Sequence, residues 1–283
     1  MFDNLKSRLK DNADNIDSAL ALYFPSENSE SAVLNEAQIY SLIGGGKKIR
    51  AFLVLELCRI LGGNIENAIP YACAIEMIHA SSLVHDDMPC MDNDDYRRGK
   101  LATHKYFGES AALLSGDALM IKAFSAISNN SCLSSEINLK AVAELAYGSG
   151  DKGMLAGQGI DILSKDKVND LDKLIRLHRL KTGQLISTAA KLGCLSANIL
   201  ENDNRYNFAV SYAENLGLAF QIVDDMLDYK DGKIEDNSFL SFMSYESAEN
   251  YAKECTAKAI EAVSSFDDGT LTDLAKYLTV REY

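Results

Sequence analysis

Aspartates gather at the end of an apolar segment in HDDMPCMDNDDYRRGK (85–100). Pro89 disfavours helical angles in the residue before it, so we expect the preceding helix to end close to Asp87. Asp92 then lies on a loop that can fold back toward Asp86. Two carboxylates about 5 Å apart repel each other by roughly 3 kcal/mol at an effective dielectric constant near 20, and a divalent cation turns this repulsion into attraction. Oxygen ligands of this kind favour Mg²⁺, which binds one or two carboxylates together with substrate phosphates.

A second polar stripe interrupts the apolar segment AFQIVDDMLD, where Gln221, Asp224, Asp225 and Asp228 are spaced i, i+3, i+4 and i+7 on one helix face. Like charges at this spacing destabilise an exposed helix slightly and a half-buried helix much more. The stripe therefore faces either solvent or a cation. A solvated helix surface is the simpler interpretation of each acidic segment alone. Two such segments, each at the end of an apolar helix, favour several Mg²⁺ ions around one polyanion.

Basic residues supply possible partners for such an anion. GGGKKIRAF (44–52) places Lys47, Lys48 and Arg50 beside glycines at the start of a helix, where the backbone comes close to a ligand and attracts anions. An exposed basic turn is the alternative interpretation. Lys181 and Thr182 lie on an apolar helix in HRLKTGQL, where a lysine can also simply extend along the surface.

The amino-acid composition limits the classes of molecule that the protein can bind. The 283-residue chain has a net charge of −13, which argues against nucleic acid and against an anionic membrane surface, although metal ions can still mediate binding of phosphates. The charged N-terminus is unlike a signal peptide, and no run of 18 apolar residues indicates a membrane span. The six cysteines form no C-x-x-C pair, so we expect reduced cysteines and a cytoplasmic protein.

The elements that must position these residues are helices. No proline follows Pro89, and apolar residues recur every three or four positions in segments such as 171–193 and 206–229. We expect an all-α protein, a single domain over residues 1–283 with about ten mostly antiparallel helices around a deep central cavity. Helices are expected near 3–22, 30–42, 48–61, 65–87, 108–128, 136–150, 170–192, 204–229, 245–264 and 269–280, with strands nowhere.

Five segments, in this order, resemble motifs of the trans-polyprenyl diphosphate synthase family, which includes farnesyl and geranylgeranyl diphosphate synthases. GGGKKIRAF is similar to the family's GGKRxRP, with Lys48 and Ala51 as departures. HDDMPCMDNDDYRRGK is similar to its first aspartate-rich motif in the bacterial and plant form. GQGID (157–161) is similar to GQxxD, LKTG to the lysine-threonine segment, and AFQIVDDMLD to the second aspartate-rich motif. The order and spacing fit along nearly the whole chain.

The resemblance implies the isoprenoid synthase fold, a homodimer and a Mg²⁺-assisted reaction. An allylic diphosphate loses its diphosphate, the double bond of isopentenyl diphosphate attacks the allyl cation, and a proton is lost, in this family to the departing diphosphate. Metal and guanidinium charge would stabilise the leaving group. An apolar cavity would keep water from the cation.

The resemblance also implies residue roles. The residues implied in Mg²⁺ binding, directly or through water, are Asp86, Asp87, Asp92, Asp224 and Asp228. Those implied in binding the allylic diphosphate are Arg97, Lys181 and Lys233. Those implied in binding isopentenyl diphosphate are Lys47, Arg50, His79 and Arg98. Those implied beside the cation are Lys181, Thr182 and Gln221. Lys233 is the weakest correspondence, because YKDGKIEDNSFLSF (229–242) is shorter than the family's loop with its GKxxGxD element.

Product length depends on the cavity floor, which the resemblance places four and five residues before the first aspartate. Both residues, Ser81 and Ser82, are small. One helical turn rises 5.4 Å, about the length of one isoprene unit, so the absence of a ring opens room for about one further unit. We expect geranylgeranyl diphosphate, with farnesyl diphosphate as the alternative if a neighbouring helix blocks the space.

Two other functions remain to be weighed. A terpene cyclase shares the first aspartate-rich helix but uses a different second metal motif, whereas DDMLD is intact here. A non-catalytic subunit that binds prenyl diphosphates or a partner synthase typically loses one aspartate motif, and this chain keeps both. We therefore expect a short-chain trans-prenyl diphosphate synthase.

Overall fold

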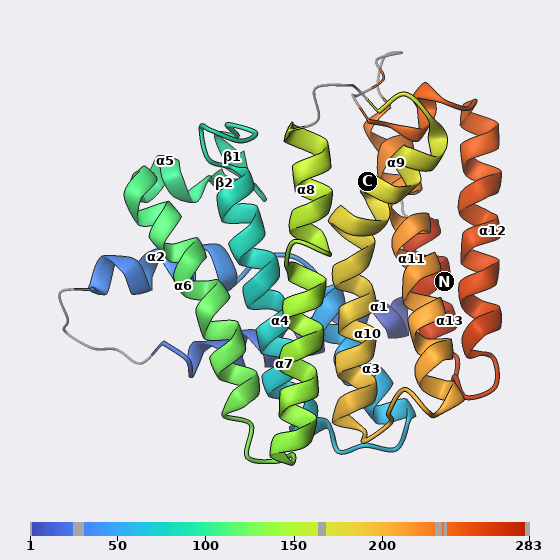
Figure 1. Ribbon diagram of the computed structural model, residues 1–283, viewed down its shortest axis with the longest axis horizontal. Coiled ribbons are helices and arrows are strands. Elements are labelled where there is room, and N and C mark those ends of the chain that lie inside the picture. Colours follow the sequence, from blue (N-terminus) through green and yellow to red (C-terminus); the bar gives the residue numbers. More distant parts are fainter. Residues whose placement is uncertain (1, 25–30, 164–167, 230–233, 235–236, 281–283) are drawn as a thin grey trace.

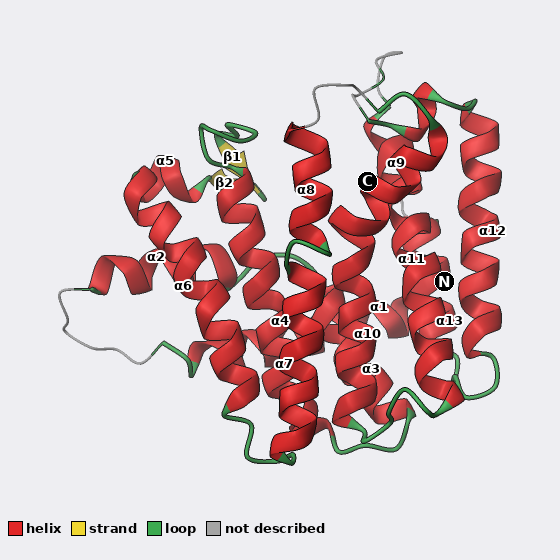
Figure 2. Cartoon of the chain, viewed as in Figure 1, coloured by secondary structure: helices red, strands yellow, loops and turns green. Residues whose placement is uncertain are grey.

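The computed structural model describes residues 2–24, 31–163, 168–229, 234 and 237–280, and the described chain is almost entirely helical (Figure 2). The all-α class is therefore confirmed. The elements before the centre of the chain are α1 (Asp3–Ala21), α2 (Ala32–Leu42), α3 (Ile49–Ile60), α4 (Ile65–Asp86), β1 (Tyr96–Arg97), β2 (Lys100–Leu101), α5 (Thr103–Phe107) and α6 (Glu109–Ser128). Those that follow are α7 (Ser135–Ser149), α8 (Met154–Leu163), α9 (Leu171–His178), η1 (Arg179–Gly183), α10 (Gln184–Ser196), α11 (Asn204–Asp228), η2 (Phe239–Ser241), α12 (Tyr245–Val263) and α13 (Thr270–Thr279).

Five of the described α-helices, α4, α7, α9, α11 and α12, begin at a residue whose side chain caps the helix. The oxygen of Asn64 accepts a hydrogen bond from the Glu66 amide at the start of α4, and Asp203 accepts one from the Arg205 amide at the start of α11. Such caps satisfy backbone N–H groups that have no partner inside the helix. Because α4 and α11 carry the two acidic segments, these caps set where the carboxylates fall along each helix.

Several described elements were not predicted from the sequence: the β1–β2 hairpin, α5, α8 and the short helix η2. The expectation of no strands is therefore wrong for this hairpin. The β1–β2 hairpin turns at Arg98 and Gly99, which both have positive φ angles and match the twist of a two-residue hairpin turn. The short helix α5 follows it. The helix α8 was missed because its two glycines, Gly157 and Gly159, lower helix propensity.

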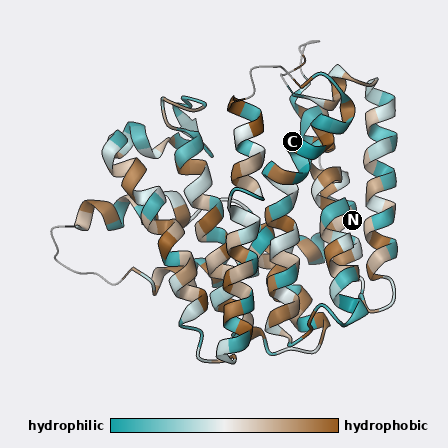
Figure 3. Ribbon diagram, viewed as in Figure 1, coloured by the Kyte–Doolittle hydropathy of each residue, from teal (hydrophilic) through white to brown (hydrophobic). Residues whose placement is uncertain are grey.

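The helices lie side by side, with α3, α4 and α10 in the middle of the arrangement (Figure 1). Each of these three helices buries most of its side chains; α10, for example, buries residues on every face. A helix that is buried on all sides is typical of the centre of a large helical domain. By contrast, α12 lies at an edge of the molecule and is largely hydrophilic (Figure 3).

One helix of the described chain, α6 (Glu109–Ser128), is long and apolar enough to cross a membrane by length and composition alone. It packs on α2, α4, α5 and α7. Its remaining surface carries Leu113, Leu114 and Ile121, of which Ile121 is 70% exposed. The core helix of a folded domain passes the same test, so we interpret α6 as part of the bundle.

Candidate active site

The loop after α4 folds back as the sequence predicts. The backbone N–H of Asp92 donates a hydrogen bond of 2.9 Å to the Asp86 carbonyl, which brings the two residues together across the proline. On the other side of Asp86, Gln158 Nε2 donates to its carboxylate at 2.8 Å. Gln158 comes from α8, so three segments meet at the end of α4.

The other aspartates of this loop are paired with cations. Asp87 is buried and accepts hydrogen bonds from the Arg97 guanidinium, which also bonds Asp94 at 2.9 Å. Asp95 is bound to Lys105 at 2.7 Å. Asp87 and Arg97, expected at the metal and the allylic diphosphate, therefore bind each other in this structure. Asp86 and Asp92 make no ion pair within the described residues, which leaves these two carboxylates for a metal.

Asp86 lies in an environment that disfavours its negative charge. The pKa of Asp86 is raised to about 6, chiefly by burial and also by the nearby Asp92 and Asp87 carboxylates, against the opposing effect of Lys181 and Arg97. A carboxylate that is desolvated and crowded by like charge is stabilised by a bound cation. The donor set therefore fits a hard divalent cation, although the described residues contain no preformed group of three or more His, Cys, Asp or Glu side chains that could hold a metal.

Lys181 and Thr182 lie on a π-helical turn, η1 (Arg179–Gly183), between α9 and α10. Such turns insert an extra residue into an α-helix and frequently occur at functional sites. Two glycines let neighbouring helices approach this turn: a Cβ on Gly157 of α8 would overlap the Lys181 backbone, and one on Gly217 of α11 would lie 2.9 Å from the Gly183 Cα. The close approach of α8 and α11 brings their polar side chains to Lys181 and Thr182.

Gly157→Ala is therefore expected to lower the free energy of unfolding by about 1–3 kcal/mol, because the added methyl group meets backbone that cannot move without separating the helices. The matched control is Gly159→Ala in the same helix, where a Cβ meets nothing within 4 Å. That change is expected to raise stability by about 0.5–1 kcal/mol through helix propensity. Urea denaturation of the two variants measures both values, and equal effects would contradict the packing argument.

The second acidic segment lines a polar cavity of about 220 Å³ together with η1. Its Asp228 faces this cavity, and Gln221 accepts a hydrogen bond of 3.1 Å from the Thr182 hydroxyl. Asp225 is held by hydrogen bonds from Gln221 and from the Phe239 amide, at 2.9 and 2.8 Å. Three residues of the stripe, Gln221, Asp225 and Asp228, therefore line the cavity, and Asp228 is also exposed to solvent. Asp224 is partly buried on the same helix.

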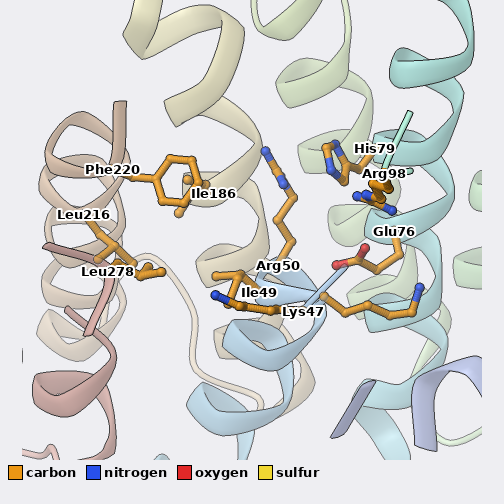
Figure 4. A pocket seen from close by; sticks show the side chains of 11 residues that line it. Lys47, Ile49, Arg50, Glu76, His79, Arg98, Ile186, Leu216, Phe220 and Leu278 are labelled. Carbon is orange, nitrogen blue, oxygen red and sulfur yellow. The ribbon is translucent and has the colours of Figure 1, made fainter. Parts of the chain in front are cut away.

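A cationic cavity of about 200 Å³ lies next to α3 and α4 and brings together the four residues expected at isopentenyl diphosphate, Lys47, Arg50, His79 and Arg98 (Figure 4). Arg50 Nε is buried without a hydrogen-bond partner in the described chain. Burial holds the pKa of His79 well below its usual range, and the surrounding cations, Arg50 first, lower it further. His79 is therefore neutral at neutral pH, and the excess positive charge around it favours an anion.

Two glycines leave room for the side chain of one of these cations, Arg98. Gly45 and Gly46 lie against the Arg98 side chain, and a Cβ on either residue would come within 3.0 Å of its guanidinium group. Gly46 also has a φ of +74°, which glycine adopts without strain. Lys48 also lines the cavity, but it is buried and its Nζ is already bound, 2.9 Å from the Leu42 carbonyl and 3.0 Å from Asp17. The glycine turn therefore makes room for the Arg98 guanidinium, whereas the Lys48 ammonium is held by protein groups.

An apolar cavity of about 400 Å³ lies between these two and is lined by Ser81 and Ser82 as well as by Asp86 at its mouth. The further apolar lining comes from Leu83, Met88, Met91, Leu113, Met120, Met154 and Leu155. It shares Arg50 and His79 with the cationic cavity, and Lys181 and Thr182 with the polar one. The three cavities are thus neighbours that share part of their walls.

Several site residues lacked a role in the sequence prediction. Gln158 and Asp161 belong to GQGID, whose similarity to GQxxD was the available signal, and Asp161 forms an ion pair with Lys181 at 2.5 Å. Asn237, which donates a hydrogen bond of 2.7 Å to Asp161, had no signal because it lies in the segment that departs from the family pattern. Lys233 lies outside the described residues.

The sequence profile of the polyprenyl synthetase family matches residues 31–267. The chain is 40% identical to a geranylgeranyl diphosphate synthase from Cyanophora paradoxa over 251 residues, 83% of each chain. It is 45% identical to a farnesyl diphosphate synthase from Micrococcus luteus over 214 residues, 75% of this chain and 70% of the relative. A crystal structure of an FPP/GFPP synthase from Zymomonas mobilis, at 38% identity, superposes with a TM-score of 0.91 and covers 99% of this chain and 100% of its own.

The chain therefore belongs to the polyprenyl synthetase family of prenyltransferases. The predicted isoprenoid synthase fold is confirmed, and so is the prediction of a short-chain trans-prenyl diphosphate synthase in the farnesyl and geranylgeranyl group. The extent of the domain over residues 1–283, and the individual residue roles, remain predictions.

Proposed function

We propose that this prenyltransferase requires Mg²⁺ and condenses isopentenyl diphosphate with allylic diphosphates, chiefly to geranylgeranyl diphosphate. The observation that carries the proposal is that the three cavities are neighbours and share Arg50, His79, Lys181 and Thr182 in their walls. A cationic pocket suits the diphosphate of one substrate. The apolar cavity suits a prenyl chain, and its acidic mouth suits the metal-bound diphosphate of the other substrate.

The two ends of the site bind different substrates. Lys47, Arg50 and Arg98 bind isopentenyl diphosphate, and the unpartnered Arg50 Nε offers a donor to its phosphate oxygens. Neutral His79 adds a hydrogen bond without adding charge. On the allylic side, the Lys181 ammonium stabilises negative charge as it develops on the leaving diphosphate. Arg97 adds a second positive charge there when the substrate diphosphate replaces Asp87 as its partner.

Mg²⁺ would be held by Asp86 and Asp92 on one side and by Asp224 and Asp228 on the other, with Asp87 in support. When bound, the metal supplies positive charge that neutralises the diphosphate and assists its departure. Thr182 and Gln221, which are hydrogen-bonded to each other, place oxygen dipoles beside the reacting carbon. The methionine-rich walls of the apolar cavity exclude water from it.

The affinity for Mg²⁺ is expected to fall as the pH is lowered, because Asp86 becomes protonated. The pKa of Asp86 is raised to about 6, so this carboxyl is mostly ionised at pH 7 and mostly protonated at pH 5, and only the ionised form binds the metal. The dissociation constant for Mg²⁺ should therefore rise about tenfold between pH 7 and pH 5. Calorimetric titration measures this, and Asp86→Asn should remove the pH dependence. A constant affinity would contradict the proposed ligand.

A homodimer is part of the proposal. The exposed apolar side chains of α6, Leu113, Leu114 and Ile121, form a surface that a second copy of the chain would bury. A cytoplasmic location is also proposed, because the six cysteines are free and four of them are buried.

Incubation of the purified protein with Mg²⁺, isopentenyl diphosphate and C5, C10 or C15 allylic diphosphates tests the function. The expected result is a C20 product that disappears on chelation of the metal. A C15 product would favour farnesyl diphosphate, and no turnover with any allylic substrate would favour a non-catalytic binding subunit.

A further inference from the structure

A short segment between α11 and α12 contacts the turn that carries Lys181 and Thr182. The contacts are made by residues 237–239, which we call the strap. Ser238 is 4% exposed, and the Phe239 side chain is fully buried and stacks on His178 with ring centroids 5.2 Å apart. The strap therefore packs against the end of α9, immediately before η1.

Asn237 makes the first connection to the turn. Its Nδ2 donates a hydrogen bond of 2.7 Å to Asp161 Oδ1, and Asp161 Oδ2 accepts one of 2.5 Å from Lys181 Nζ. The Asn237 carbonyl accepts a hydrogen bond of 2.9 Å from His178 Nε2. Asn237 has a φ of 58°, a left-handed conformation that asparagine tolerates better than most residues. Asn237 thus fixes the carboxylate that fixes the Lys181 ammonium.

Phe239 makes the second connection. Its backbone N–H donates a hydrogen bond of 2.8 Å to Asp225, which accepts a second one of 2.9 Å from Gln221. Gln221 in turn accepts a hydrogen bond of 3.1 Å from the Thr182 hydroxyl. Both Asp225 oxygens are thus occupied by protein donors, so this carboxylate positions protein groups. Two residues of the strap are therefore linked to two adjacent residues of η1.

We propose that the strap positions Lys181 and Thr182 for the allylic diphosphate, and that Asn237 is the residue through which it sets the Lys181 ammonium. This inference rests on the proposed function of Lys181. Asn237 acts through Asp161 and is a positioning residue. Without the amide of Asn237, the Asp161 side chain can rotate. The Lys181 ammonium is then no longer held in one position.

The test is Asn237→Gly, which keeps the left-handed backbone and the carbonyl contact to His178 but removes the amide donor. The matched control is Asn198→Gly, an exposed asparagine with the same φ of 58° just after α10. The KM for the allylic diphosphate is expected to rise about five- to tenfold in Asn237→Gly, the effect of losing one hydrogen bond of ordinary net strength. The KM for isopentenyl diphosphate should stay within about twofold, and the control should leave both unchanged.

A second measurement does not depend on turnover. The rate at which Lys181 is acetylated by a small reagent, followed by mass spectrometry, is expected to rise at least about threefold in Asn237→Gly, because the loosened Asp161 no longer holds the ammonium. The rate in Asn198→Gly should match that of the unmodified protein. An unchanged allylic KM together with an unchanged acetylation rate would overturn the inference and leave the proposed function intact. Absence of turnover in the unmodified protein would overturn the proposed function, while the acetylation rate would still test the strap.

Discussion

Asp86→Asn is expected to lower kcat/KM for condensation by about 10³-fold. Asp86 is the carboxylate that lines the apolar cavity at its mouth, and its charge is supported there by Gln158 and opposed by Asp92. An amide at this position keeps the shape and one oxygen but removes the negative charge that would hold the metal. Losses of about 10²–10³-fold follow removal of a single group that stabilises developing charge. Steady-state assays at saturating Mg²⁺ measure the effect.

The stability of this variant separates function from folding. Because the pKa of Asp86 is raised above its ordinary value, the ionised side chain destabilises the folded protein at pH 7 in the absence of metal. This cost is absent at pH values below the pKa that the Asp86 carboxyl has in the unfolded chain. It grows as the pH rises toward its pKa of about 6 in the folded protein. Asp86→Asn should therefore unfold at the same temperature or higher at pH 7 without Mg²⁺. An inactive variant of lowered stability would point to misfolding instead.

Asp95→Asn is the matched control, because it removes a carboxylate from the same loop. Asp95 is exposed and paired with Lys105, and a solvent-exposed ion pair of this kind contributes little to stability. Its kcat/KM should stay within about threefold of the unmodified protein. Equal losses in the two variants would show that loop charge in general matters, rather than Asp86.

Local signals in the sequence predict a large part of this site. Pro89 and the apolar face of 65–87 place the end of α4 at Asp86, one residue from the prediction, and the return of the loop brings Asp92 back to it. Apolar periodicity predicts the helices that carry Gln221 and Lys181. Each of these features depends on neighbours in the sequence, so it can be read without knowledge of the tertiary structure.

The features that were missed depend on contacts between distant segments. The helix α8 forms although its glycines disfavour it, because Gly157 lets α8 pack against the backbone of η1. The π turn itself has no pattern of apolar residues. Asn237 reaches Asp161 across 76 positions of the sequence. The pairing of Asp87 with Arg97 could likewise not be predicted, because the sequence does not show which of the five aspartates forms an ion pair.

Ser81→Phe is expected to change the main product from C20 to C15. Ser81 is 1% exposed and lines the apolar cavity, five residues before Asp86 and therefore about 7.5 Å deeper along the helix axis. A phenyl ring there fills the space that about one isoprene unit of 5 Å would occupy. The cavity of about 400 Å³ accepts the ring, so the change should not unfold the protein.

Product sizing after incubation with isopentenyl diphosphate and a C5 allylic substrate measures the change. Ser81→Ala is the control, because it keeps the space and removes only a hydroxyl that has no hydrogen-bond partner in the described chain. Its products should match those of the unmodified protein. A C20 product from Ser81→Phe would mean that the growing chain does not pass Ser81. The limit on its length would then lie on α6 or α8, where Met120 and Leu155 line the same cavity.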